Sequence, residues 1–366
     1  TASNNTAVGY YALTANTTGD LNVAIGSNAL DANQVGDRAV AIGHNALTSQ
    51  APTSNTDTNN VAVGLNSQFS TTTGVNNTAI GTKSLESNTT GNQNVAVGSF
   101  ALDNNTTADN NTAVGYNALT ANTTGASNTA VGKGALDATT TASSCSALGQ
   151  SCLTNLTTGV SNTAVGDNTG NAITTNAENT LIGALCGNSG NISRCTIVGK
   201  GAFANASDGD SNNIFMGFNS GHNSNSCSNN TALGTQSLQE NHADNNTAIG
   251  YQALLLNTTG TKNVAVGALA LDANTTASHN SALGYSSLGS NTTGEQNTAI
   301  GYNALKANTE GDFNASFGGG SLDANTTGSS NVAVGQNSLG ANTTASNNTA
   351  VGRSALGANT TGASNV

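Results

Sequence analysis

The residues best suited to chemistry in this 366-residue chain form no familiar catalytic pattern. Lys133 and Lys200 each lie between two glycines, without the spacing of a phosphate-binding loop. The histidines match no Ser/His/Asp or metal-ligand spacing, and we expect them to be exposed. They are His44, His222, His242 and His279. We therefore expect no catalytic residue, no metal site and no cofactor, and we expect that the chain is not an enzyme.

The cysteines are candidates for disulfide formation. They are Cys145, Cys152, Cys186, Cys195 and Cys227. No Cys-x-x-Cys pair or Cys/His cluster is present, which disfavours zinc. If each repeat described below is one rung, Cys145 and Cys195 lie three rungs or roughly 14 Å apart, beyond disulfide reach. Cys186–Cys195 and Cys195–Cys227 are better pairs, and the alternative is that all five are small buried residues.

Asparagines of the pattern Asn-x-Ser/Thr are candidates for N-linked glycosylation. Those at the Asn-Thr-Thr corner of the repeat described below are Asn16, Asn88, Asn105, Asn122, Asn257, Asn274, Asn291, Asn325, Asn342 and Asn359. Asn and Thr are also favoured in turns and side-chain ladders, so the pattern arises without modification too. Glycans on successive rungs would be crowded at a spacing of about 4.8 Å. Both interpretations stay open.

Nearly all of these residues belong to one repeated unit, represented by Asn111–Ser127 (NTAVGYNALTANTTGAS). The unit occurs in 21 copies, and most neighbouring copies start 17 residues apart, as at Asn94, Asn111 and Asn128. We number it 1 to 17 from its first Asn. Position 3 is mostly Ala, position 4 is apolar, position 5 is Gly, position 8 is Ala or Ser, and position 9 is usually Leu. Positions 12 to 15 usually read Asn-Thr-Thr-Gly or Asn-Thr-Thr-Ala.

The repeat predicts a fold. No i, i+3, i+4 spacing of apolar residues indicates helices, whereas short β-branched segments bounded by Gly and Asn indicate two strands per unit. A 17-residue unit buries too little to fold alone and must stack on its neighbours. We therefore predict an all-β, parallel β-solenoid of about 21 rungs, each formed by one 17-residue unit. Positions 4 and 9 would form the core, and Asn at positions 1 and 12 would stack in amide ladders.

We expect residues 1–366 to form a single solenoid domain. Residues 1–161 and 247–366 are regular, whereas 162–246 contain repeats that are one residue shorter or longer than usual and most of the cysteines. The step from Ala39 to Asn60 is longer than the usual repeat and contains Pro52, which predicts a surface loop.

Composition limits the partners. Only 7% of residues are charged, the formal net charge is −11, and no basic stripe is present, so we expect no nucleic-acid partner. No stretch approaches the ~20 apolar residues of a membrane span. Both chain ends fall within a repeat, so we expect either a segment of a longer chain or a homo-oligomer that stacks head to tail into a filament.

The motif Asn-Thr-Ala-Val-Gly-x-x-Ala-Leu resembles the head repeats of YadA-like trimeric autotransporter adhesins. The Asn-Thr-Thr-Gly corners resemble arrays in bacterial and phage proteins described as tail-fibre-like. The resemblance implies a left-handed β-roll, surface exposure, adhesion and a homotrimer. The 17-residue unit is longer than the usual coil of that family, and no stalk, membrane anchor or C-terminal chaperone domain is present.

These observations predict an extracellular structural fibre or filament subunit, assembled by end-to-end stacking of rungs and able to act in adhesion. The alternative is a trimeric surface adhesin, or a phage tail-fibre shaft, that binds a host surface or a glycan. The location would be extracellular, at the cell surface or in a virion fibre. Ice binding by threonine ladders is disfavoured, because neighbouring Thr side chains in a strand point to opposite faces.

Overall fold

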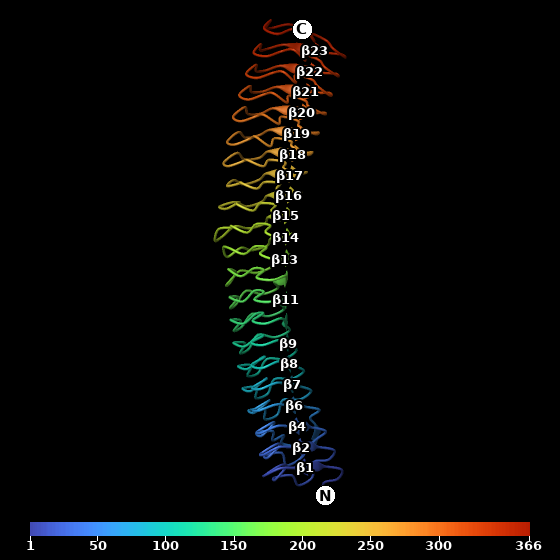
Figure 1. Cartoon of the computed structure of the whole chain (residues 1–366), viewed down its shortest axis with the longest axis vertical. Coiled ribbons are helices and arrows are strands. Elements are labelled where there is room, and N and C mark those ends of the chain that lie inside the picture. The colour runs from blue at the N-terminus through green and yellow to red at the C-terminus, as the bar shows by residue number, and fades with distance from the viewer. The chain divides into compact units, whose positions relative to one another are not determined.

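The computed structural model describes residues 1–366 and contains strands and loops but no helix. The chain forms a parallel β-solenoid of about 20 rungs, with about 17 residues in each, which confirms the predicted fold class (Figure 1). The handedness stays a prediction. Two compact units, residues 1–179 and 180–366, are described separately below. Their boundary differs from the limits at 161/162 and 246/247 that we drew from the regularity of the repeat.

Each rung contributes one short strand to the main sheet. The strands of the first unit are β1 (Thr6–Val8), β2 (Val23–Ile25), β3 (Gly36–Asp37), β4 (Val40–Ile42), β5 (Thr56–Asp57), β6 (Val61–Val63), β7 (Thr78–Ile80), β8 (Val95–Val97), β9 (Thr112–Val114), β10 (Thr129–Val131), β11 (Ser146–Leu148) and β12 (Thr163–Val165). The strands of the second unit are β13 (Thr180–Ile182), β14 (Thr196–Val198), β15 (Ile214–Met216), β16 (Thr231–Leu233), β17 (Thr247–Ile249), β18 (Val264–Val266), β19 (Ser281–Leu283), β20 (Thr298–Ile300), β21 (Ala315–Phe317), β22 (Val332–Val334) and β23 (Thr349–Val351).

The strands of the main sheet pair in parallel and in register within each unit. In β9 and β10, for example, Thr112 lies beside Thr129 and Ala113 beside Ala130. The amide of Thr112 donates to the carbonyl oxygen of Asn128 at 2.8 Å. Equivalent positions of the repeat therefore form straight columns of side chains along each unit.

The core consists of smaller side chains than we predicted. Alternation along each strand points position 3 inward and positions 2 and 4 outward. Ala113, Ala118 and Leu119, at positions 3, 8 and 9, are fully buried. Val114, at position 4, is only half-buried. The assignment of position 4 to the core was therefore wrong, whereas position 9 is confirmed as core.

The rest of each rung consists of loops with a left-handed backbone rather than the second strand that we predicted. Asn117, Leu119 and Asn110, at positions 7, 9 and 17, have φ angles of 55°, 53° and 61°. Such angles are incompatible with extended strands. Position 5 has the strictest requirement: Gly115 has φ of 141°, and an added Cβ would lie 2.6 Å from the carbonyl oxygen of Gly132. Only glycine accommodates both the angle and this close approach.

Two columns of buried asparagine amides hold the rungs together, as predicted. At position 1, the Asn111 side chain accepts from the amide of Asn128 and donates to the carbonyl oxygen of Gly125, each at 2.9 Å. At position 12, Asn122 Nδ2 donates to Asn105 Oδ1 and to the same Gly125 oxygen, also at 2.9 Å. These side chains satisfy loop carbonyls and amides that have no strand partner.

In two irregular rungs of the second unit, a larger side chain at position 3 accompanies a glycine at position 9. In the rung that starts at Asn213, Phe215 replaces the inward Ala and Gly221 replaces Leu. A Cβ on Gly221 would lie 2.7 Å from the Phe215 ring. Leu181 and Gly187 are exchanged in the same way, with a Cβ on Gly187 only 3.2 Å from Leu181. In these two rungs the larger side chain at position 3 therefore fills the space that Leu occupies elsewhere, whereas the rung that starts at Cys195 buries large side chains at both positions, Ile197 and Phe203.

The predicted loop in the first unit is confirmed as a mostly exposed excursion around Pro52. Its end returns as β5, which pairs with β3 as a separate two-stranded sheet. A salt bridge of 2.7 Å joins Arg38 and Asp57 beside this pair. The insertion thus leaves the main sheet intact, because β4 still pairs with β6 in register.

Candidate functional site

The outward face of the strands carries a row of apolar side chains, one per rung, at position 4. We call these side chains the outer row. In the first unit the outer row comprises Val8, Ile25, Ile42, Val63, Ile80, Val97, Val114, Val131, Leu148 and Val165. In the second unit it comprises Ile182, Val198, Met216, Leu233, Ile249, Val266, Leu283, Ile300, Phe317, Val334 and Val351. All of them are exposed or half-exposed, for example Leu148 at 50% and Ile249 at 36%.

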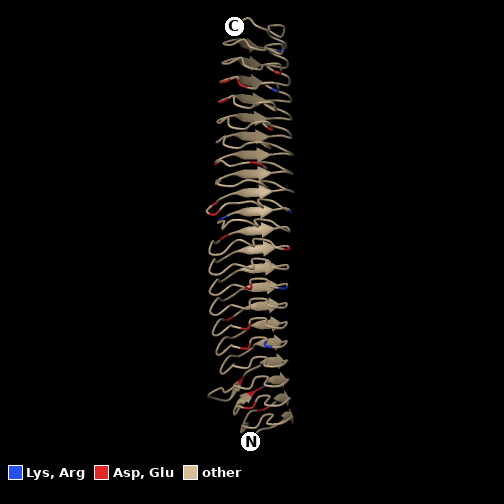
Figure 2. Ribbon diagram, turned by 60° about the vertical axis from the view of Figure 1, so that its left-hand side comes forward, with Lys and Arg blue, Asp and Glu red and all other residues tan.

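The face around the outer row is uncharged. Position 2 points to the same side and is most often Thr or Val. None of the three-residue strands contains Lys, Arg, Asp or Glu. Asp37 and Asp57 lie in the two-residue strands β3 and β5, and the other charged residues lie on the loops (Figure 2). An apolar row of this extent is the kind of surface that proteins cover with a partner.

The outer row is long enough to matter energetically. Covering about a third of each side chain contributes on the order of 0.5–1 kcal/mol per residue. For the eleven residues of the second unit this amounts to roughly 6–11 kcal/mol per copy. Association costs an estimated 4–15 kcal/mol in lost freedom of motion. A row of many rungs can therefore offset this cost, whereas two or three rungs cannot.

The cysteine side chains are all buried. Burial raises the pKa of Cys152 to about 12 and that of Cys195 to about 11, and it also raises the pKa of Cys145 and Cys227. Because the thiolate is the reactive form, these groups are poor nucleophiles near neutral pH. Cys145, at a ladder position, donates from Sγ to the carbonyl oxygen of Gly159 at 3.3 Å, in place of the usual asparagine.

The disulfide candidates stay predictions. Cys145, Cys152 and Cys227 are thiols in this structure. Cys186 donates to the carbonyl oxygen of Ile197 at 3.4 Å, and Cys195 donates to a carbonyl oxygen at 3.3 Å.

The predicted glycan acceptors occupy the ladder at position 12. Eight of them are fully buried, whereas Asn16 and Asn359 are half-buried. The nitrogen to which a glycan would be attached is Nδ2. In Asn122 this atom donates both ladder hydrogen bonds described above, and in Asn88 and Asn257 it also donates to loop carbonyls. A glycan on such a nitrogen would replace one of its hydrogens and separate the rungs.

The histidines and the isolated lysines do not converge. His44, His242 and His279 are exposed on different rungs, as predicted, whereas His222 is half-buried with Nδ1 2.7 Å from the carbonyl oxygen of Gly201. Lys133 and Lys200, also on different rungs, are exposed. No group of three or more His, Cys, Asp or Glu residues is placed to hold a metal ion.

A pair of acidic side chains escaped the sequence-based prediction. Glu86 and Asp103 occupy position 10 on consecutive rungs. Lys83 lies 3.0 Å from Glu86. Burial, and then the charge of Glu86, raise the pKa of Asp103 to about 6. The pair could have been found by treating Asp and Glu as one class.

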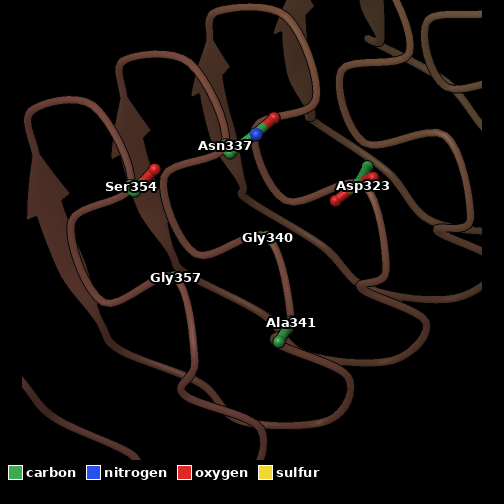
Figure 3. Close-up of a pocket in the computed structure, with 6 residues that line it drawn as sticks. All are labelled: Asp323, Asn337, Gly340, Ala341, Ser354 and Gly357. Atoms are coloured by element: carbon green, nitrogen blue, oxygen red, sulfur yellow. The ribbon is translucent and has the colours of Figure 1, made fainter.

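A pocket of about 440 Å³ lies where position 10 is glycine on two successive rungs (Figure 3). Its lining residues are Asp323, Asn337, Gly340, Ala341, Ser354 and Gly357. Asp323 is the only titratable group among them, and burial raises its pKa. One carboxyl group without a partner does not provide the paired acid and base of hydrolytic catalysis.

Comparison with models of known protein families and with curated proteins found no match to this chain. The structure contains no helix with the length and apolar character that crossing a membrane would require. The evidence for function therefore comes from the geometry of the solenoid itself.

Proposed function

We propose that this chain is a structural subunit of an extracellular fibre, and that copies of it associate side by side through the outer row. The observation that carries the proposal is the continuity of the outer row within each unit. It places an apolar side chain on every rung, without a charged residue in the strands of the main sheet. Asparagine ladders and parallel pairing provide the stiffness that a fibre needs.

Identical copies are the partner that best fits the outer row. The row repeats at the strand spacing of about 4.8 Å, so a second copy presents side chains at the same interval. A closed arrangement of two or three copies would bury the rows around a common axis. The resemblance to trimeric adhesins supports three copies. Adhesion to a host surface or a glycan, and end-to-end stacking, stay predictions.

The proposal is tested by light scattering coupled to size exclusion, with electron microscopy of the same fractions. The test variant carries Ile249→Asp, Val266→Asp and Leu283→Asp in the outer row. The control carries Thr259→Asp, Thr276→Asp and Thr293→Asp, which add the same charge at exposed loop positions of the same three rungs. We expect a discrete multiple of 35.9 kDa for the unmodified chain and the control, and smaller species for the outer-row variant.

An unmodified chain that is monomeric at all concentrations would contradict side-by-side association. Fibres that lengthen with concentration and form equally well from the outer-row variant would instead support end-to-end stacking.

A further inference from the structure

A second set of glycan acceptor patterns lies at a different corner of the rung. In these triplets, Asn-Asn-Thr, the first Asn occupies position 17, the second occupies position 1 of the next rung, and the Thr occupies position 2. The first residues are Asn4, Asn76, Asn110, Asn229, Asn245 and Asn347. None of them was among the acceptors predicted above.

The position-17 asparagines differ from those at position 12 in accessibility. All six are exposed and have left-handed backbone angles, with φ between 57° and 62°. The side chain of Asn110 makes no hydrogen bond within the chain, whereas Asn122 Nδ2 is fully buried and donates two. Asn76 uses only its oxygen, which accepts from Asn59 at 3.2 Å, so its Nδ2 is also available.

The third residue of each triplet is accessible too. Thr112, which completes the triplet of Asn110, lies at position 2 on the outward face of β9 and is half-exposed. The middle residue, Asn111, points inward and forms the ladder. The same short segment thus anchors the rung through its second residue and presents its first and third residues to solvent.

We propose that the position-17 asparagines, rather than those at position 12, are sites of N-glycosylation in this fold. The donor would be an oligosaccharide linked to a lipid pyrophosphate. The amide Nδ2 forms a bond to the anomeric carbon, the bond from that carbon to the pyrophosphate oxygen breaks, and the lipid pyrophosphate leaves with the electron pair. The amide loses one proton to a base of the transferase, and no oxidation or reduction occurs.

The spacing of the rungs sets the pattern of occupancy. Asn229 and Asn245 lie on successive rungs, about 4.8 Å apart, so we expect one glycan between them. Asn76 and Asn110 are two rungs apart, and Asn347 lies six rungs beyond Asn245. Asn76, Asn110 and Asn347 can therefore be occupied together.

The experiment uses the full chain, secreted from a eukaryotic host that contains an oligosaccharyltransferase, and analyses the folded, secreted fraction. Peptide N-glycosidase in heavy-oxygen water converts each glycosylated Asn to a labelled Asp, which peptide mass spectrometry locates. Thr112→Ala removes the Asn110 pattern and Thr124→Ala removes the Asn122 pattern. Both change an accessible threonine and leave the ladder asparagine intact.

We expect the label at Asn110 and none at Asn122. Thr112→Ala would lower the mass of the secreted protein by one glycan, Thr112→Ser would restore it, and Thr124→Ala would leave it unchanged. Chains modified at Asn122 before folding cannot close the ladder and would be missing from the folded fraction. Label at Asn122 with an occupancy like that of Asn110 in folded protein, or no label at any position-17 asparagine, would overturn the proposal. Neither result depends on side-by-side association.

Discussion

Two neighbouring residues of β9 give a sharp test of which side of the strand is the core. Ala113 is fully buried between the Ala residues of the adjacent strands, and Val114 is half-exposed in the outer row. The substitution Ala113→Asp would bury a carboxylate without a partner and would overfill a space that holds one methyl group. We expect Ala113→Asp to cost about 3–5 kcal/mol locally. We expect Val114→Asp to cost about 1 kcal/mol or less.

Urea unfolding followed by circular dichroism, at low protein concentration, measures both variants against the unmodified chain. A solenoid of many similar rungs unfolds in parts, so hydrogen exchange of the amides in β8 to β10 gives the local free energy. Both variants introduce one carboxylate, at neighbouring residues of the same strand, so a much larger loss in Ala113→Asp reports that residue 113 points into the core. If Val114→Asp loosens these strands as much as Ala113→Asp, the assignment of position 3 as core is refuted.

Three further changes test the packing and the charges. Gly115→Ala would combine strained φ with a clash against the next rung and cost several kcal/mol, whereas Gly319→Ala, which has open space and no positive φ, would change thermal unfolding by about 0.5 kcal/mol at most. Gly221→Ala would clash with the Phe215 ring. Adding Phe215→Ala to the same chain removes the ring and would recover part of the lost stability. Strictly additive losses in thermal unfolding would contradict the proposed packing of residue 221 against Phe215. Because the pKa of Asp103 is raised in the fold, its ionisation costs stability above pH 6 and this cost disappears as the pH falls toward 4. Asp103→Asn would therefore raise the free energy of unfolding at pH 7.5 by about 1–2 kcal/mol after allowance for its partial exposure, seen as a higher melting temperature, and would change both little at pH 4. The opposite trend would show that the raised pKa is wrong.

The repeat made the solenoid, its period and the asparagine ladders predictable, because each depends on the same residue recurring at the same position. The inward face was harder to predict. Val114 is more hydrophobic than Ala113, so hydrophobicity alone favours the wrong residue for the core. Position 2 held the missing signal: Thr112 and Val95 occupy equivalent sites, and a site that accepts both a polar and an apolar side chain faces outward. Position 4 is two residues beyond position 2 in the strand, so its side chain points to the same outward face.

The glycan acceptors show why local sequence was insufficient for the candidate sites. Asn110 and Asn122 satisfy the same three-residue pattern, but one lies at an exposed corner and the other in a buried ladder. The difference arises from bonds between rungs, such as that from Asn122 to Asn105 on the preceding rung. A three-residue motif contains no information about contacts at that separation.

The irregular rungs indicate which side of the solenoid is constrained. The step from β13 to β14 is one residue shorter than the usual repeat and the step from β14 to β15 is one residue longer, yet Leu181, Ile197 and Phe215 remain in register. The loops therefore absorb the missing or extra residue, and the strands do not shift. Because a slip of one residue would exchange the inward and outward faces, it would both open the core and break the outer row. Stability alone requires the inward register, but it does not require an apolar side chain at position 4. Polar residues are accepted beside it at position 2, so the retention of Ile182, Val198 and Met216 across these rungs is best explained by a partner that covers the row.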